Sequence, residues 1–229
     1  MHPLDNPAWT ALTTLQAAVA LGSDLARRFP PDMAVHGGIP AVTSEAFESL
    51  SQIAREPVGL FFSALPQLPS GWTITRQLRM IQMLQEPGEI PGFPLAPSAS
   101  IVELTTDDLP EMTGIYEITR PGRTIARRIQ QLGLFLGVRN AGKLAAMAGL
   151  RLHLPGYREI TTVATHPDNI GRGYATALVA ELVRRIRAAG EQPFLHVRDD
   201  NTRAIRIYER LGFRERTRFD YVAIQYTEL

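Results

Sequence analysis

The chain has 229 residues, which is enough for one or two domains with a sizeable core. Its 24 Lys and Arg residues nearly balance its 23 Asp and Glu residues, so the net charge of +1 gives no reason to expect nucleic acid as a partner. The absence of cysteine excludes disulfides, Cys-ligated metals and a cysteine nucleophile. No run approaches the roughly 18 to 20 apolar residues of a membrane span, so we expect a cytoplasmic protein that does not use a membrane.

The N-terminal region is predicted to mix helices and strands. We expect helices at 11–21 and 44–55, and strands at 25–29, 57–62 and 72–83, where the second half of the last could also be helical. The stretch 84–100 is rich in proline and glycine, which disfavour regular elements, so it is interpreted as a linker. We therefore divide the chain into an N-terminal α/β region with its linker, residues 1–97, and a second domain, residues 98–229.

After the linker, the pattern favours a sheet with helices beside it. Strands are expected at 100–104, 133–139, 143–152 and 159–165, and helices at 107–118 and, for one short element, 124–130. The sequence Asn140-Ala141-Gly142 between the second and third of these strands is typical of a hairpin turn.

A glycine-containing turn joins the strand at 159–165 to a strongly amphipathic helix. Backbone N–H groups at the start of a helix lack partners, and the helix dipole favours negative charge there. Gly171 and Gly173 would let the backbone approach a phosphate closely. The turn is therefore predicted to bind a phosphorylated ligand, although an ordinary glycine turn before a helix has the same pattern.

A short buried strand at 193–197 and a second helix follow. Asn201 is a suitable N-cap for this helix, Tyr208 lies on its apolar face, and Gly212 ends it. The glycine turn resembles the coenzyme pyrophosphate loop of the GNAT superfamily of N-acetyltransferases. Asn201 and the helix end from Tyr208 to Phe213 resemble the second signature of that superfamily, an Asn followed by a helix that ends in Tyr-Glu-x-Leu-Gly-Phe. The strand at 193–197 resembles the branch grouped with glycine N-acyltransferases.

This resemblance covers roughly residues 98–229. It implies an α/β (α+β) GNAT fold, with a mixed and mostly antiparallel sheet flanked by helices, and an N-terminal α/β extension that could be a degenerate GNAT-like half. It implies acetyl-CoA as cosubstrate, no metal, and transfer of an acetyl group to a primary amine of a small or amino-acid-like molecule by direct attack. A longer acyl-CoA, or a non-catalytic CoA-binding regulatory module, remains an alternative, and a homo-oligomer stays open.

The resemblance also assigns coenzyme binding to the strand before the turn, the turn itself and the second helix, namely to Val163, Ala164, Thr165, Ile170, Gly171, Arg172, Gly173, Tyr174, Ala175, Thr176, Asn201 and Tyr208. Ile170 departs from the superfamily pattern, which has Arg or Gln at this position. A backbone N–H of the strand, at a bulge that the resemblance supplies, would stabilise the oxyanion.

Two residues are predicted to carry the proton transfers. The GNAT resemblance implies that a Glu at the start of this strand, at the expected mouth of the cleft, acts as general base, directly or through water, and Glu159 occupies that position. Glu159 could equally be an exposed carboxylate, with His153 and His166 as alternates. Tyr208 would act as general acid, because a phenol of pKa about 10 can return a proton to a thiolate of pKa about 8.5. Tyr208 could otherwise be only a core aromatic.

Overall fold

The computed structural model describes residues 2–227 of the chain. In this part an eight-stranded sheet has the order β4-β11-β5-β10-β9-β8-β7-β6, and all neighbours are antiparallel except β9 and β10. The strands are β4 (Val58–Phe62), β5 (Trp72–Gln85), β6 (Ala99–Glu103), β7 (Phe135–Asn140), β8 (Lys143–Leu154), β9 (Tyr157–Thr165), β10 (Gln192–Arg198) and β11 (Phe213–Tyr226). The predicted fold class, a mixed and mostly antiparallel sheet flanked by helices, is confirmed.

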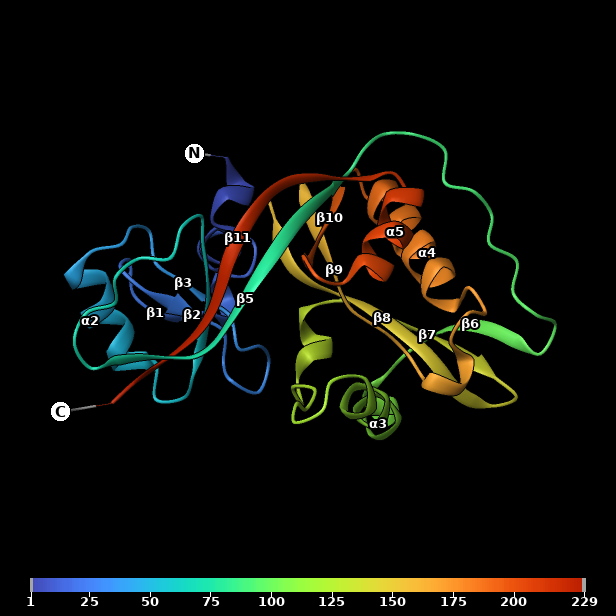
Figure 1. Cartoon of the computed structure of the whole chain (residues 1–229), viewed down its shortest axis with the longest axis horizontal. Coiled ribbons are helices and arrows are strands. Elements are labelled where there is room, and N and C mark those ends of the chain that lie inside the picture. The colour runs from blue at the N-terminus through green and yellow to red at the C-terminus, as the bar shows by residue number, and fades with distance from the viewer. Residues whose placement is uncertain (1, 228–229) are drawn as a thin grey trace.

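The elements gather into two lobes that share this sheet (Figure 1). The larger lobe carries α3 (Leu109–Thr119), η4 (Ile129–Leu132), α4 (Tyr174–Ala188) and α5 (Thr202–Arg210). The smaller lobe holds most of the N-terminal region: α1 (Pro7–Thr13), α2 (Ser44–Ile53) and the two-residue strands β1 (Leu21–Gly22), β2 (Arg27–Arg28) and β3 (Gly37–Gly38). No helix among the described residues is long and apolar enough to cross a membrane.

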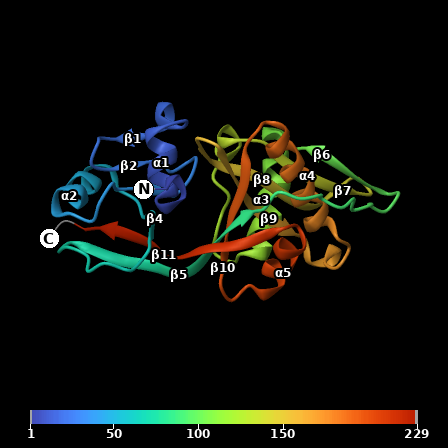
Figure 2. The same cartoon turned by 90° about the horizontal axis from the view of Figure 1, so that it is seen from above.

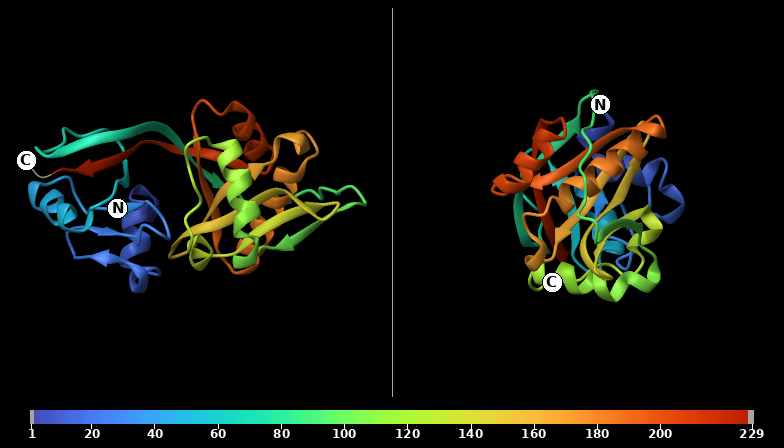
Figure 3. Two further views of the ribbon diagram at one scale, coloured as in Figure 1. Left: turned by 90° about the horizontal axis from the view of Figure 1, so that it is seen from below. Right: turned by 90° about the vertical axis from the view of Figure 1, so that its right-hand side faces the viewer.

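The strands β5 and β11 run side by side through both lobes, as Figures 1 and 3 show. At one end β5 pairs with β10 through Met80 to Leu84, and at the other end β11 pairs with β4. The C-terminal half of β11 therefore lies in the smaller lobe, beside α2 (Figure 2). The boundary after residue 97 stays a prediction, but the sheet crosses it, because a strand from before the linker lies between β10 and β11.

The amphipathic helix α4 packs its apolar face against the sheet, as predicted. The side chains of Leu178, Val179, Leu182 and Val183 are fully buried in the main core. Burying a side chain of this kind stabilises the fold by roughly 1.5–3 kcal/mol. Gly190 follows the helix with a φ of +77°, which is the left-handed conformation that glycine adopts at helix ends.

The predicted linker has no regular element between β5 and β6, but it is held against α4. Arg184 donates a hydrogen bond to the Pro91 carbonyl at 3.0 Å, and Arg187 donates to the Glu86 carbonyl at 2.6 Å. Three apolar linker side chains also pack on the main core, namely those of Ile90, Phe93 and Leu95. The linker is therefore part of the larger lobe's surface.

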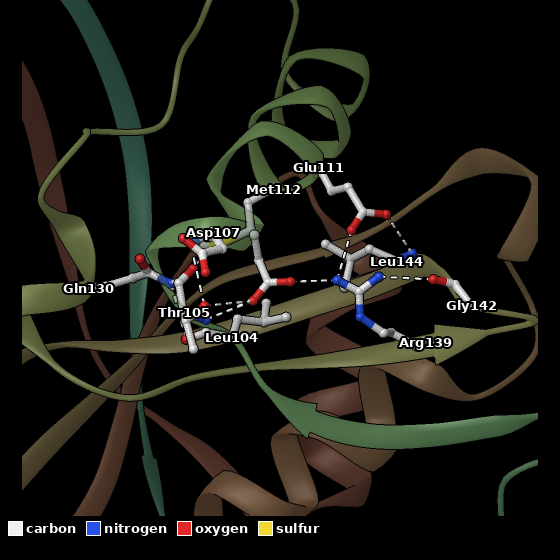
Figure 4. Close-up of polar contacts among 10 residues, drawn as sticks. Leu104, Thr105, Asp107, Glu111, Met112, Gln130, Arg139, Gly142 and Leu144 are labelled. Carbon is white, nitrogen blue, oxygen red and sulfur yellow. Dashed lines mark hydrogen bonds and ion pairs between the residues drawn. The ribbon is translucent and has the colours of Figure 1, made fainter.

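Two carboxylates, Glu111 of α3 and Asp108 at its N-cap, fix the helix to Arg139 of the hairpin of β7 and β8 (Figure 4). Glu111 accepts a hydrogen bond from Arg139 at 2.8 Å and another from the Leu144 amide at 3.1 Å. Arg139 also donates to the Gly142 carbonyl in the hairpin turn at 2.9 Å. These bonds set the position of α3, whose C-terminal end reaches the site described below.

Several predicted elements differ from the structure. The helix expected at 11–21 is wrong, because α1 begins at Pro7 and ends at Thr13, where hydroxyls of Thr13 and Thr14 bond to carbonyls four residues back and compete with the helix. The short helix expected at 124–130 is one turn of 3-10 helix at Ile129–Leu132, and the strand expected at 25–29 is reduced to Arg27–Arg28. The whole of β5 is strand.

Candidate active site

A cavity of about 500 Å³ opens where β9 and β10 separate. These strands pair in parallel only from Gln192 to Leu195, opposite Tyr157 to Ile160. Beyond that point they diverge, and residues 161–165 of β9 and 196–198 of β10 line the cavity. The smaller lobe closes one side of it with residues such as Met33 and Phe61.

A β-bulge shapes the cavity wall on β9. Ala164 lies opposite Met147 and Thr161 lies opposite Gly149, so β9 has one residue more than β8 over this span. Thr162 in the bulge has a φ of +55°, which is a strained conformation for a β-branched residue and costs about 1–3 kcal/mol. The bulge that the resemblance implied is confirmed. Strain of this size persists where a site depends on the local backbone geometry.

Arg120, at the end of α3, braces the bulge. Its guanidinium donates a hydrogen bond to the Val163 carbonyl at 3.1 Å and lies 4.7 Å from the centre of the Tyr116 ring. Burial lowers the pKa of Arg120 from its usual value, but an arginine remains charged at neutral pH. A fixed positive charge therefore lies beside the bulge, where the acyl oxygen is expected.

Tyr208 lies on α5 and lines the same cavity. Its side chain is 7% exposed, and its hydroxyl makes no hydrogen bond to the described residues. Burial raises the pKa of Tyr208 to about 12, against the opposing positive charge of Arg120. The phenol therefore stays protonated at neutral pH. Tyr208 also packs 6.0 Å from Phe213, so it is both a core aromatic and a residue of the cavity wall.

The predicted position of Glu159 at the mouth of the cleft is wrong. The residue is fully buried, and it does not line the cavity. Its carboxylate accepts hydrogen bonds from Arg151 at 2.7 and 2.9 Å, from the Leu152 amide at 3.3 Å and from His196 Nδ1 at 2.9 Å. Burial would raise the pKa of Glu159, but Arg151 and His196 hold it well below its usual range. A carboxylate enclosed in this way is poorly placed to take a proton from an amine.

None of His153, His166 and His196 presents a free ring nitrogen to the cavity. His196 lines the cavity, but its Nδ1 faces Glu159 and its Nε2 accepts a hydrogen bond from Gln82 at 3.1 Å. His153 pairs with Glu191 at 2.5 Å, away from the cavity lining. His166 caps the single turn Pro167–Asn169 through its Nδ1, which accepts from the Asp168 amide, and it does not line the cavity.

A second cavity of about 350 Å³ lies over the glycine turn. Gly171 and Gly173 have φ values of +87° and +77°, and a Cβ added to either would meet open space. Helix α4 begins directly after the turn, so its free N–H groups face this cavity. The buried hydroxyl of Tyr174 has no hydrogen-bond partner among the described residues. These features fit a phosphate of the coenzyme.

Three arginines of α5 complete the second cavity, and the sequence reasoning missed them. Arg203, Arg206 and Arg210 line it together with the glycine turn. Their spacing of three and four residues places them on one face of the helix. This spacing could have identified them in the sequence. Three positive charges beside a helix N-terminus suit the phosphates of a CoA molecule.

The two cavities meet at β9 and the start of α4, because Thr165 and Ala175 line both. Of the residues assigned to the coenzyme, most line one cavity or the other: Val163, Ala164, Ile170, Asn201 and Tyr208 in the first, and Gly171, Gly173, Tyr174 and Thr176 in the second. Arg172 is exposed and lines neither cavity. Asn201 caps α5 through a 3.2 Å hydrogen bond to the Ala204 amide, so its predicted capping role is confirmed.

Among residues 2–227 no group of three or more His, Asp or Glu side chains is arranged to hold a metal ion.

Sequence comparison relates this chain to known acetyltransferases. The family of FR47-like proteins matches residues 131–222. The chain is 35% identical over 82 residues to a mycothiol acetyltransferase of Saccharopolyspora erythraea and 33% identical over 119 residues to one of Mycobacterium avium. These matches cover 35% and 45% of the chain, which spans 27% and 38% of the length of the two relatives.

Structural comparison covers the whole chain. A GNAT-family protein from Novosphingobium aromaticivorans is 33% identical, with a TM-score of 0.87 over 100% of both chains. A GCN5-related N-acetyltransferase from Kribbella flavida is 17% identical, with a TM-score of 0.61 over 93% of both chains, and shows the same fold. These matches do not distinguish the glycine N-acyltransferase branch, which stays a prediction. The full-length match at 33% identity, with the glycine turn, the bulge and the separated strands, shows that the chain belongs to the GNAT family.

Proposed function

We propose that this protein transfers an acetyl group from acetyl-CoA to a primary amine of a small molecule. The observation that carries the proposal is the convergence of the glycine turn, the bulge of β9 and the Tyr208 hydroxyl on two adjoining cavities. One cavity suits the phosphates of the coenzyme. The other places a polar hydroxyl and an irregular stretch of backbone where an acyl group would lie.

Acetyl-CoA would supply the activated thioester. The backbone amides of residues 171–176 and the arginines of α5 would hold its phosphates. Arg120 would hold the bulge in place through its bond to the Val163 carbonyl. The backbone N–H groups of β9 would then be oriented toward the oxyanion before the reaction begins. The Tyr208 hydroxyl, protonated because its pKa is raised to about 12, would donate a hydrogen bond to the departing thiolate sulfur.

The amine would lose its proton to water that enters the cavity. Glu159 is enclosed by Arg151, His196 and the Leu152 amide, so it has no free lone pair aimed at the cavity. Its role in this proposal is positional, because it neutralises Arg151 and holds that guanidinium at the cavity wall. This replaces the general-base role that the sequence predicted.

The test is release of free CoA in the presence of acetyl-CoA and a panel of amines. A thiol-reactive dye reports CoA alone, because the chain has no cysteine of its own. The same assay with longer acyl-CoA molecules compares acyl chains, and a reaction without amine measures hydrolysis. We expect amine-dependent release, and mass spectrometry should find the acetylated amine. Tight CoA binding with no release for any amine would support the non-catalytic module instead.

A further inference from the structure

The acidic and basic side chains that line the first cavity are all of one sign, positive. Six arginines line it and no carboxylate does, counting the described residues: Arg76, Arg120, Arg123, Arg151, Arg198 and Arg203. Arg120 braces the bulge, Arg198 pairs with Asp200, and Arg203 also lines the second cavity. The other three come from separate elements, with Arg76 on β5, Arg151 on β8 and Arg123 in the segment after α3.

These three side chains are not fully compensated by the protein. Arg151 uses Nε and Nη2 to bind Glu159, and its Nη1 has no partner among the described residues. Arg76 and Arg123 make no ion pair and no side-chain hydrogen bond within the same part of the chain. Partial burial lowers the pKa of Arg76, and the positive charge of Arg123 adds to that effect. The three positive charges therefore lie close together beside the cavity and repel one another. An anionic ligand would remove this electrostatic cost.

A hydroxyl lies among the three arginines. Tyr221 lines the cavity, is buried, and makes no hydrogen bond to the described residues through its hydroxyl. Burial raises the pKa of Tyr221, while the positive charges of Arg151, Arg123 and Arg76 oppose the rise. All three therefore act on the same hydroxyl. The chain makes room for it at Gly59, where an added Cβ would lie 2.0 Å from the Tyr221 oxygen.

A second polar group at this place also lacks a partner. His36 lines the cavity beside Tyr221, with ring centres 5.5 Å apart, and is 5% exposed. Its Nδ1 is buried without a hydrogen-bond partner among residues 2–227. Buried polar atoms in native proteins are nearly always satisfied, so an unpartnered one on a cavity wall points to a ligand.

We propose that Arg76, Arg123 and Arg151 form a subsite for a carboxylate of the acceptor, next to the hydroxyl of Tyr221. The acceptor is then an amine that also carries a carboxylic acid, a conclusion that rests on the proposed acetyl transfer. Arginine suits this task because its planar guanidinium binds both oxygens of a carboxylate at once. The amine of the same molecule would point toward the bulge of β9, which lines the cavity with the three arginines.

Binding tests the subsite without catalysis. Calorimetry on the CoA-saturated protein would compare the common amino acids and β-alanine with their matched carboxamides, and β-alanine with phosphoethanolamine. We expect at least one acid to bind at least tenfold more tightly than its amide, since a charge-assisted pair of hydrogen bonds is lost in the amide. Equal binding of acids and amides, tighter binding of phosphoethanolamine, or no binding by any acid would overturn the proposal.

Two matched variants locate the effect. Arg123→Gln should weaken binding of the acid tenfold or more and leave binding of the amide and of acetyl-CoA unchanged. Arg127→Gln is the control, because Arg127 lies in the same segment, is 80% exposed and does not line the cavity. Arg76→Gln repeats the test on another strand if Arg123→Gln lowers the melting temperature. An equal loss for acid and amide in both cavity variants would contradict the assignment.

Catalysis separates this proposal from the one it rests on. If acids bind through Arg123 but no amine releases CoA, the carboxylate subsite stands and acetyl transfer falls. If amides and acids are acetylated with equal KM, acetyl transfer stands and the subsite falls. If both hold, Arg123→Gln should raise KM for the acid tenfold or more with little change in kcat.

Discussion

Arg151 and Glu159 form a two-point ion pair, with Nη2 2.7 Å from Oε1 and Nε 2.9 Å from Oε2. The Glu159 side chain is buried, whereas the Arg151 side chain is 16% exposed and lines the cavity. The pair therefore joins the interior of the sheet to the site. Its acidic member supplies charge balance, and its basic member lines the first cavity.

Glu159→Gln should destabilise the protein by about 3–5 kcal/mol, which is typical when one partner of a buried ion pair is removed. The cause is the Arg151 charge, which stays buried without its counter-ion. Urea unfolding measures the effect. The double variant Glu159→Leu with Arg151→Met is the control, because it removes both charges and should cost less than the single change. A double variant as unstable as the sum of two single variants would contradict the pairing.

Stability should fall as the pH drops below about 6.5. Burial, with the positive charge of Arg151, holds the pKa of His36 well below its usual 6.5. The unfolded chain then takes up a proton below about 6.5 that the folded chain does not, so protons favour unfolding. Glu159 has a depressed pKa, so its contribution is complete above the unfolded value of 4.5 and is lost at lower pH.

Replacing the histidine separates these two effects. His36→Asn should flatten the dependence of the free energy of unfolding on pH between 5 and 6.5, and leave the loss at lower pH in place. Chemical unfolding at a series of pH values gives both slopes. An unchanged slope in the upper range would show that His36 is not the group that titrates.

Tyr208→Phe should lower kcat by about the 10²–10³-fold that is typical when a hydrogen-bond donor to developing negative charge is lost. Only an oxygen is removed, so the melting temperature and CoA affinity should change little. Because burial raises the pKa of Tyr208 to about 12, the wild-type rate should show no decline from ionisation of this phenol up to about pH 10. Full activity of the Phe variant would reduce Tyr208 to a packing residue and leave the fold assignment intact.

Gly173→Asp should abolish measurable CoA binding, because a side chain and a negative charge would enter the phosphate cavity. Gly156→Asp is the matched control. Gly156 has a φ of +79° and open space around it, as Gly173 does, but it lies in the turn between β8 and β9 and lines neither cavity. Calorimetry with CoA compares the two at similar backbone strain. Equal affinity in both variants would place the phosphates elsewhere.

A fragment of residues 98–229 should fail to fold by itself. It lacks β5, so β10 and β11 would each lose a paired neighbour, and the apolar residues Ile81 and Met83 would be missing from the main core. Circular dichroism and proteolysis of the fragment measure this, and a longer fragment that starts at residue 72 is the control. A folded, CoA-binding 98–229 fragment would restore the two-domain division that the linker suggested.

Local patterns in the sequence predicted the parts of the site that are formed by residues close together in the chain. The glycine turn, α4 and the Asn201 cap are all set within a few positions, so spacing and residue type sufficed. The family resemblance added the bulge on β9. The order of strands was not accessible in this way, because β5 reaches β10 and β11 only through tertiary pairing.

The environment of Glu159 could not be predicted for a similar reason. Its partners Arg151 and His196 lie 8 and 37 positions away, on the two neighbouring strands, and only the register of the sheet brings them together. The cavity arginines come from three separate elements and share no motif. Charge on a cavity wall is thus a property of the assembled sheet, not of any one segment.

The position of β5 also bears on how the protein reaches its native state. Thr73 and Gln225 bond across 152 positions, and Gln85 and Leu211 across 126. During synthesis, residues 72–85 leave the ribosome long before their partner strand exists, and their backbone N–H and C=O groups lack that partner in the meantime. Contacts so distant in sequence slow folding, because the loop must close before the pairing stabilises it. Strand β11 completes the sheet, so the cavity between the lobes would form only after residues 213–226 have been made.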